Sequence, residues 1–290
     1  MSWRTVVIGG RAKLELKLDS MVVRGDEVVK IHLSEISTLI IENTAVSMTS
    51  ALLCELINRK VKVIFCDENR NPVSELVPYY GSHDASARVK MQLAWTDYTK
   101  AAVWTAIVRD KIEKQREILR SLHKEEEALL CQYLSELSFN DATNREGHAA
   151  KVYFNAVFGL QFSRSQENSI NAALNYGYTI LLSAFNREIV SNGCITQIGI
   201  FHDNIFNHFN LGSDLMEPFR PIVDMAVYKL QPEKFEKQEK SIIVNILNQR
   251  VYIDGKEHYV NNAIRIYCKS VLEALNENDI SLMRFYRNEL

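Results

Sequence analysis

Three polar residues in the second half of the chain occupy positions that helical periodicity otherwise fills with apolar side chains. Glu146 begins one such stripe, His202 lies within another, and Glu217 follows in a third segment that carries Asp224 on the same face. Burying a charge or an unpaired imidazole is costly unless a partner compensates it. Two carboxylates and one imidazole that converge from separate segments would form a hard, oxygen-rich site, which suits Mg²⁺ or Mn²⁺.

The spacing of these residues requires a turn in the chain before they can share a metal ion. His202 and Glu217 are 15 residues apart, and one straight helix would separate them by roughly 22 Å. Asn210, Gly212 and Ser213 lie between them and are residue types that favour a turn. The spacing therefore permits a common site.

Local helix chemistry offers a different explanation for the same residues. Thr143 and Glu146 have the spacing of a capping box, and so do Asp214 and Glu217. A single His on an apolar face is also compatible with a hydrogen-bonded histidine in the protein core. From the residues alone, helix capping, core hydrogen bonding and metal binding all remain open for these side chains.

The elements that must position these side chains change character near residue 80. Before it, short β-branched and alternating runs such as residues 14–18 predict strands, with one helix over 47–58, and together these favour a small sandwich. After residue 85 the apolar residues recur with helical period. The predicted helices span residues 91–122, 126–138, 144–158, 168–190, 198–209, 214–230 and 260–276.

Two C-terminal segments depart from the helical pattern. Asp254 and Gly255 separate two β-type runs over 250–260 and predict a hairpin with a type I′ turn. Residues 232–240 are so polar that they predict an exposed loop. The predicted fold class is α+β with two domains. These are a small N-terminal β-sandwich-like domain over 1–80, a linker over 81–90, and a larger all-α catalytic domain over 91–290 with a short β-hairpin near 251–260.

Charge is distributed unevenly along the chain, although the formal net charge is only −2. Residues 88–124 hold nine Lys or Arg against four Asp or Glu. Such a segment either binds a polyanion or forms a solvated helix face with ion pairs between neighbouring turns. Asn171, Asn175 and Tyr178 form a polar stripe of helical spacing, which also fits a hydrogen-bonded seam between helices.

Composition indicates an ordinary soluble globular protein. Hydrophobic residues make up 47% and charged residues 24%, and no apolar run reaches the roughly 18 residues needed to span a bilayer. The 5 cysteines include no CxxC pair, which argues against a disulfide framework or a structural zinc site. The N-terminus lacks the features of a signal peptide, so we expect a cytoplasmic protein with no membrane partner.

Four segments of the helical half carry a resemblance to a known family. They are residues 144–150 (NREGHAA), 171–178 (NAALNYGY), 199–202 (GIFH) and 214–221 (DLMEPFRP), the last followed by Asp224. In their order and spacing the sequence resembles the CRISPR-associated adaptation integrase, Cas protein one, and most closely its type II-A branch. The resemblance covers the full length and includes the layout of strands followed by helices.

The resemblance implies an activity and a set of partners. Members of this family form homodimers that join a dimer of the small Cas protein two in a heterohexamer. The complex captures double-stranded DNA and inserts it into the CRISPR repeat, through attack of a 3′-OH on a phosphodiester. Metal-dependent endonuclease activity with Mg²⁺ or Mn²⁺ is also implied, and further type II-A adaptation and effector proteins are expected partners.

The resemblance also assigns roles to residues. It implies that Glu146, His202 and Glu217 are the catalytic metal ligands, with Glu217 where many members have Asp. The longer side chain of Glu217 is expected to preserve chelation. Matches to polar positions around that site are Asp214, Tyr153, Asn171, Tyr178 and Arg220.

The basic segment 88–124 is expected to bind the DNA duplex through contacts with its phosphates. The residues expected to make these contacts are Arg109, Lys111, Lys114, Arg116 and Arg120. Two other functions remain open. One is a DNA-binding scaffold whose carboxylates only cap helices, and the other is an unrelated metal hydrolase that acts on a small molecule.

Overall fold

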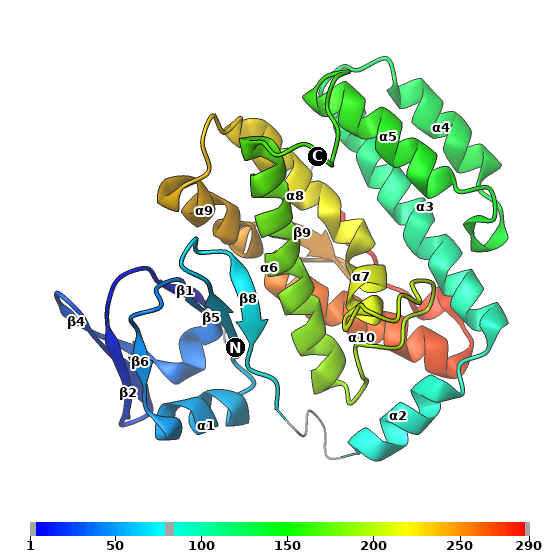
Figure 1. Cartoon of the computed structure of the whole chain (residues 1–290). Coiled ribbons are helices and arrows are strands. Elements are labelled where there is room, and N and C mark those ends of the chain that lie inside the picture. Colours follow the sequence, from blue (N-terminus) through cyan, green and yellow to red (C-terminus); the bar gives the residue numbers. More distant parts are fainter. Residues whose placement is uncertain (1–3, 79–83, 288–290) are drawn as a thin grey trace.

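The computed structural model describes residues 4–78 and 84–287 and has the α+β class expected from the sequence. In Figure 1 the strands coloured blue and cyan gather on one side, and the helices coloured from cyan-green to red form a larger body beside them, which also holds the strand β9. Within the two described ranges, no helix combines the length and the apolar composition needed to cross a bilayer. The five cysteines are free, and Cys66, Cys194 and Cys268 are buried.

The described N-terminal strands form two four-stranded sheets. The first has the order β1 (Arg4–Ile8), β5 (Ile36–Ile41), β7 (Lys62–Cys66) and β8 (Pro72–Glu75). Its first three strands are parallel, and β8 is antiparallel to β7. The second has the order β4 (Val28–His32), β3 (Ser20–Arg24), β2 (Lys13–Lys17) and β6 (Ser47–Met48).

The two sheets share one hydrophobic core, as the predicted sandwich requires. Leu14 and Met21 from the second sheet meet Leu39 and Val63 from the first, and α1 (Ser50–Asn58) covers the same core. The alternation predicted for residues 14–18 is only partly correct. Leu14 is fully buried, but Leu18 is 79% exposed because it lies in the β2–β3 turn with a positive φ of 46°.

The other face of the first sheet packs against the helices. Ile40, Ile64 and Cys66 belong to the hydrophobic core of the helical part and not to the core between the sheets. The predicted domain limits stay a prediction. Of the predicted linker, residues 85–90 lie in the helix α2 (Ala85–Leu93), and residues 81–83 fall outside the described part.

The helical part is built around α6. Its long helices are α3 (Asp97–Ser121), α6 (Ser169–Ser191) and α10 (Val260–Glu277). Shorter ones are α4 (Glu127–Glu136), α5 (Arg145–Phe158), α7 (Asn210–Met216), α8 (Arg220–Leu230) and α9 (Lys237–Val244). The helix α6 contacts α7, α8, α9 and α10, while α3 contacts α4, α5, α8 and α10 (Figure 1).

Two predicted long helices are interrupted by residues that start a new helix. The prediction of one helix over 91–122 is wrong, because α2 ends at Leu93 and Thr96 caps α3 by accepting the backbone N–H of Thr99 at 3.1 Å. The predicted helix 214–230 is divided by a 3₁₀ turn, Glu217–Phe219. Pro218 and Pro221 stand at the starts of the turn and of α8, where a missing N–H is tolerated.

Two further predictions near the C-terminus have opposite outcomes. The hairpin is confirmed as β9 (Arg250–Ile253) and β10 (Lys256–Tyr259), with Asp254 and Gly255 at φ of 52° and 71° as a type I′ turn requires. The exposed loop over 232–240 is wrong in its second half, because α9 begins at Lys237 and Lys240 is only 4% exposed. A capping box between Glu236 and Glu239 starts this helix.

The largest error in the predicted elements is the helix over 198–209. These residues form an irregular loop that leads into α7. Apolar residues at helical spacing produced the prediction, but two of them, Ile198 and Ile205, are exposed to solvent. The backbone of this loop is held instead by the buried carboxylate of Asp214.

Candidate active site

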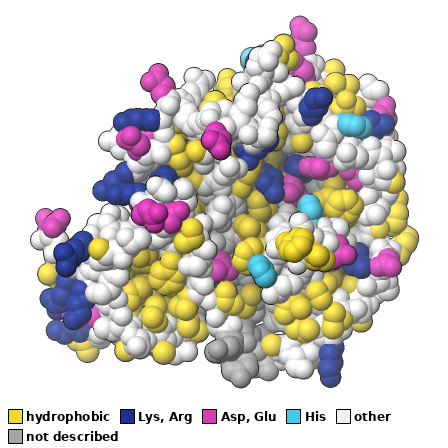
Figure 2. Space-filling model, in the orientation of Figure 1, with side chains coloured by type: hydrophobic (Ala, Val, Ile, Leu, Met, Phe, Trp, Pro, Cys, Tyr) yellow, Lys and Arg dark blue, Asp and Glu magenta, His cyan; other side chains and the backbone are white. Residues whose placement is uncertain are grey.

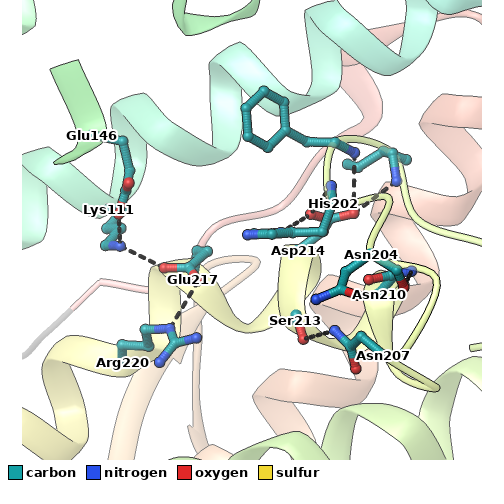
Figure 3. A network of polar contacts seen from close by, with 12 residues as sticks. Lys111, Glu146, His202, Asn204, Asn207, Asn210, Ser213, Asp214, Glu217 and Arg220 are labelled. Carbon is teal, nitrogen blue, oxygen red and sulfur yellow. Dashed lines mark hydrogen bonds and ion pairs between the residues drawn. The ribbon is translucent and has the colours of Figure 1, made fainter. Parts of the chain in front are cut away.

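Glu146 and Glu217 come together around one cationic side chain. Glu146 lies in the first turn of α5, Glu217 follows α7, and Lys111 reaches both from the middle of α3. The ammonium of Lys111 binds Glu146 Oε1 and lies 2.5 Å from Glu217 Oε2 (Figure 3). The two carboxylates therefore converge on a single position, which a lysine nitrogen occupies.

The charges at this position are strongly coupled. Glu217 and Lys111 are each 5% exposed, and Arg220 Nε lies 2.8 Å from Glu217 Oε1. Burial alone would raise the pKa of Glu217, but Arg220 and Lys111 outweigh it and lower that pKa to about 2. Burial likewise acts to lower the pKa of Lys111, and Glu217 and Glu146 outweigh it so that the pKa is raised. Both groups are therefore charged at neutral pH.

Neither glutamate side chain closes the predicted capping box. Asn144 caps α5, and its Oδ1 accepts the backbone N–H of Gly147 at 3.3 Å. Asp214 does not cap a helix that contains Glu217, because its carboxylate turns toward the preceding loop. The capping explanation is therefore excluded for both side chains, whose oxygens bind Lys111 and Arg220 instead.

Asp214 organises the loop that carries His202. Its fully buried carboxylate accepts backbone N–H groups from Ile200 at 2.7 Å, Phe201 at 3.1 Å and His202 at 3.1 Å. The same carboxylate lies 2.5 Å from Nδ1 of His202 (Figure 3). Gly199 makes this wrap possible, since a Cβ there would stand 2.6 Å from Asp214 Oδ2. These bonds replace the helical pattern that the sequence suggests.

His202 is held in place but is not buried in the core. Its side chain is 42% exposed, and its ring packs edge-on against Trp104 with centroids 5.7 Å apart. The hydrogen bond to Asp214 raises the pKa of His202, and burial opposes this effect. His202 is near enough that its charge helps to lower the pKa of Glu217.

The three predicted ligands do not yet form one cluster. In the part of the chain that the structure describes, no three His, Cys, Asp or Glu side chains are close enough together to hold a metal ion. Glu146 and Glu217 share a position through Lys111, while His202 faces Asp214. The structure thus brings two of the three ligands together and places the third nearby.

Lys111 belongs to the site, although the sequence predicts it only as part of a basic segment that contacts DNA. Its place on α3 continues the buried positions Trp104, Ile107 and Val108, so it is a charged residue on an apolar face. The same criterion that singles out Glu146 also identifies Lys111. The charge of the basic segment does not reveal that Lys111 pairs with the two glutamates.

A cavity of about 200 Å³ opens beside the carboxylates. Lys111, Glu146, Tyr178, Glu217, Arg220 and Asp224 are among its lining residues. The hydroxyl of Tyr178 donates to Asp224, and the guanidinium of Arg220 lies 4.6 Å from the centre of the Tyr178 ring. Burial raises the pKa of Asp224 to about 6, against the lowering effect of the Tyr178 hydrogen bond. Acidic, basic and phenolic groups therefore line this one cavity, which we call the recess.

The remaining residues matched by resemblance have different positions. Tyr153 is fully buried, and burial raises its pKa well above the usual value, with Asp224 adding to the effect. Asn171 is 3% exposed and donates to the backbone oxygens of Ser163 at 2.8 Å and Gln166 at 2.9 Å. Asn171 therefore closes the loop before α6, outside the cavity lining, and the predicted interhelical seam does not describe it.

Two of the five α3 residues that are predicted to contact DNA phosphates are buried, and DNA binding by this segment stays a prediction. Lys111 and Lys114 are buried, and Lys114 pairs with Asp110 while its nitrogen lies 4.1 Å from the centre of the Tyr286 ring. A buried, paired lysine cannot reach a phosphate at the surface. The prediction of DNA contacts depends on the number of basic residues in the segment. That number does not distinguish the buried turns of α3 from its exposed ones.

The arginines of the same helix are closer to solvent. Arg116 is half-buried and pairs with Glu113 and Glu127, and Arg120 pairs with Glu127 at 2.8 Å. Arg109 is exposed. Of the five predicted phosphate contacts, only Arg109 and Arg120 are exposed side chains.

Comparisons with known proteins agree on one family. The family model described as CRISPR associated protein Cas1 matches residues 5–255. A CRISPR-associated endonuclease Cas1 of Neisseria meningitidis is 32% identical over 266 residues, which cover 89% of this chain and 87% of that protein. One of Pyrobaculum aerophilum is 30% identical over 226 residues, which cover 71% and 74% of the two chains.

Solved structures share the fold at lower identity. A casposase bound to its integration product has a TM-score of 0.77 and 20% identity, with 97% of this chain and 92% of that chain covered. A Cas1 protein of Thermotoga maritima has a TM-score of 0.76 and 16% identity, with 99% and 100% covered. A Cas6-RT-Cas1–Cas2 complex has a TM-score of 0.74 and 18% identity, with 97% and 36% covered. On the family match and the Neisseria relative, this chain belongs to the Cas1 family of CRISPR-associated proteins.

Proposed function

We propose that this chain is a metal-dependent DNA endonuclease and integrase that inserts captured duplex DNA into a CRISPR array. The observation that carries the proposal is the convergence of Glu146 and Glu217, from two separate elements, on one cation beside a cavity. Family membership supports the reaction class, because the relatives are named CRISPR-associated endonucleases. The casposase bound to an integration product supports strand joining by this fold.

Glu146, His202 and Glu217 would hold Mg²⁺ or Mn²⁺. The two carboxylates fit a metal ion because they already surround one cationic group, the ammonium of Lys111. His202 can bind the ion through Nε2, because its Nδ1 is hydrogen-bonded to Asp214. A carboxylate in this position commonly orients the imidazole of a metal-binding histidine. When bound, the ion would polarise a phosphodiester oxygen and stabilise the leaving 3′ oxygen.

The other side chains of the recess prepare these ligands. Arg220 keeps Glu217 ionised and also lines the cavity, where its positive charge suits an incoming phosphate. Asp214 fixes the tautomer and the direction of the His202 ring. Positioned groups of this kind favour in-line attack by a 3′-OH for joining, or by water for cleavage.

The proposed substrate is double-stranded DNA, as captured fragment and as CRISPR repeat. Arg109 and Arg120 remain candidates for phosphate contacts because they are exposed. The proposed partners are a second copy of the chain, a Cas2 dimer and further type II-A adaptation and effector proteins, acting together in the cytoplasm. The Cas6-RT-Cas1–Cas2 complexes among the structural neighbours support the Cas2 partnership.

A joining assay tests the proposal. Purified protein, with and without Cas2, is incubated with a short duplex, a supercoiled plasmid that carries the repeat, and Mg²⁺ or Mn²⁺. We expect metal-dependent joining that Glu146→Gln, Glu217→Gln or His202→Ala abolishes. Glu113→Gln is the matched control, since that carboxylate pairs with Arg116 away from the recess.

Two results would contradict the proposal in different ways. Full joining activity in all three variants would show that these residues are not the catalytic ligands. DNA binding that is unchanged by the variants, without any joining by the wild type, would favour a scaffold. A small-molecule hydrolase would lack the salt-dependent affinity for duplex DNA that phosphate contacts produce.

A further inference from the structure

The loop that carries His202 exposes two adjacent large apolar side chains. Ile205 is 86% exposed and Phe206 is 83% exposed, and Phe201 in the same loop is 46% exposed. Figure 2 shows a hollow on this face where acidic and basic side chains meet, with apolar side chains on the surface beside it. We call residues 205–206 the apolar tip.

The apolar tip is a built structure. The amide of Asn210 donates to the backbone oxygens of Gln197 and Asn204, each at 3.0 Å, and Asn204 Oδ1 accepts the backbone N–H of Phe206 at 2.9 Å. Asn207 Nδ2 lies 3.3 Å from Ser213 Oγ (Figure 3). These bonds fix the backbone on both sides of the tip, so the exposure of its side chains is part of the folded conformation.

The same loop connects the tip to the proposed ligands. His202 lies three residues before Ile205 and is fastened to Asp214. The ring of Phe201 stacks on Trp104 of α3, with centroids 4.3 Å apart and an interplanar angle of 5°. A ligand that contacts the tip is thereby held at a defined place relative to the recess.

The recess creates a need for such a contact. Glu217 is 5% exposed, and the cavity beside it measures about 200 Å³. A regular duplex is too wide to enter a space of that size, so we expect a phosphodiester to approach Glu217 more closely where the DNA is locally bent or unstacked. Proteins commonly achieve this by inserting an apolar side chain between base steps.

We propose that Ile205 and Phe206 form an apolar wedge that contacts unstacked bases of the DNA next to the reacting phosphodiester. The inference rests on the proposed function and names how the site admits its substrate. The tip's small size favours bases over a protein partner, since a stable protein interface needs about 800 Å² on each side. The residues that flank the tip, Asn204 and Asn207, are polar.

Base unstacking provides a direct test. The duplex carries 2-aminopurine next to the joining position mapped with the wild type, and its fluorescence is followed on protein addition in EDTA. We expect a rise with the wild type that Phe206→Ala reduces by at least half. Because stacking of a base on an aromatic ring contributes about 1–3 kcal/mol, we expect joining at saturating DNA to fall about tenfold. Phe206→Trp should retain both signals.

The controls separate the wedge from folding and from the proposed function. Leu18→Ala removes an equally exposed leucine in the strand region and should change neither signal. Thermal unfolding of Phe206→Ala should match the wild type, as expected for an exposed side chain. A wild type that neither binds nor joins DNA would overturn the proposed function, and the wedge with it.

Two results would overturn the wedge alone. One is a wild type that joins DNA while Phe206→Ala gives the same fluorescence rise and the same joining rate. The other is a Phe206→Ala variant that joins DNA normally on its own but no longer co-elutes with Cas2, which would make the tip a protein contact. Either result leaves the assignment of the carboxylates untouched.

Discussion

Replacing Lys111 by Met should destabilise the metal-free protein at neutral pH, and a divalent cation should recover the loss. The ammonium of Lys111 lies between Glu146 and Glu217, and it contacts one carboxylate oxygen of each. Met has a similar length and no charge, so the substitution removes the cation without opening a large void. Two carboxylates would then face each other with no group between them.

The magnitude follows from the burial of the partners. Removing one member of a buried ion pair typically costs about 3–5 kcal/mol, because the remaining charge stays buried without compensation. Glu217 keeps Arg220 at 2.8 Å, and the side chain of Glu146 is 26% exposed and keeps some contact with water. We therefore expect a loss of about 3 kcal/mol, at the lower end of that range.

Urea unfolding measures this loss in EDTA and again with MnCl₂. A cation that binds only the folded state at a hundred times its Kd adds about 2.7 kcal/mol, so Mn²⁺ should restore most of the stability of Lys111→Met. The wild type should gain less at the same concentration, because its own ammonium competes for the two carboxylates. Lys100→Met is the matched control on α3, because Lys100 pairs with the exposed Asp97 and its substitution should cost under about 1 kcal/mol.

The double variant Lys111→Met, Glu146→Gln tests whether the two carboxylates repel each other once the ammonium is removed. Neutralising Glu146 removes the facing charge, so this variant should be more stable in EDTA than Lys111→Met alone. If Lys111→Met unfolds in EDTA at the same urea concentration as the wild type, the ammonium does not compensate the carboxylates. If Mn²⁺ stabilises both proteins equally, the cation and Lys111 do not compete for one position.

Three more predictions concern the surroundings of the site. Asp214→Asn should lower the raised pKa of His202 toward 6.5, as measured by an NMR titration of the metal-free protein. In the wild type, the stability that this pair contributes is complete below pH 6.5 and is lost as the pH rises through the folded-state pKa. An unchanged pKa of His202 in the variant would refute the role of Asp214. Gly199→Ala should cost about 1–3 kcal/mol on thermal unfolding, because its Cβ would stand 2.6 Å from Asp214 Oδ2, whereas Gly10→Ala, with open space around it, should be nearly neutral; equal effects would contradict this account. Asp224→Asn should remove a pH dependence of the free energy of unfolding. Because the pKa of Asp224 is about 6 in the folded state against 3.8, this group lowers the wild-type stability by about 3 kcal/mol as the pH rises from about 4 to about 6. The same change of unfolding free energy with pH in both proteins would exclude this role of Asp224.

Features that depend on neighbouring residues could be predicted from the sequence. The type I′ hairpin at Asp254 and Gly255 follows from residues that tolerate positive φ, and the strands before residue 80 follow from β-branched and alternating runs. Glu146 and Glu217 could be singled out because each breaks an apolar pattern. The sequence also indicated, through motif order and spacing, a family that the comparisons confirm.

Features that depend on residues far away in the sequence could not be predicted from it. The apolar spacing of 198–209 matches a helix, yet the carboxylate of Asp214 takes three backbone N–H groups of that segment and holds it as a loop. The nine basic residues of 88–124 predict a DNA grip, yet Lys111 and Lys114 turn inward to meet carboxylates. In both cases a long-range interaction overrides a local preference.

The sequence by itself determined which polar groups had to be compensated, because a charge placed in an apolar pattern is costly wherever the fold puts it. Only the tertiary structure decided what compensates them. Lys111 and Glu217 are 106 residues apart and meet because α3 packs against the turn that follows α7. That meeting depends on the packing of whole helices, and no local pattern encodes it.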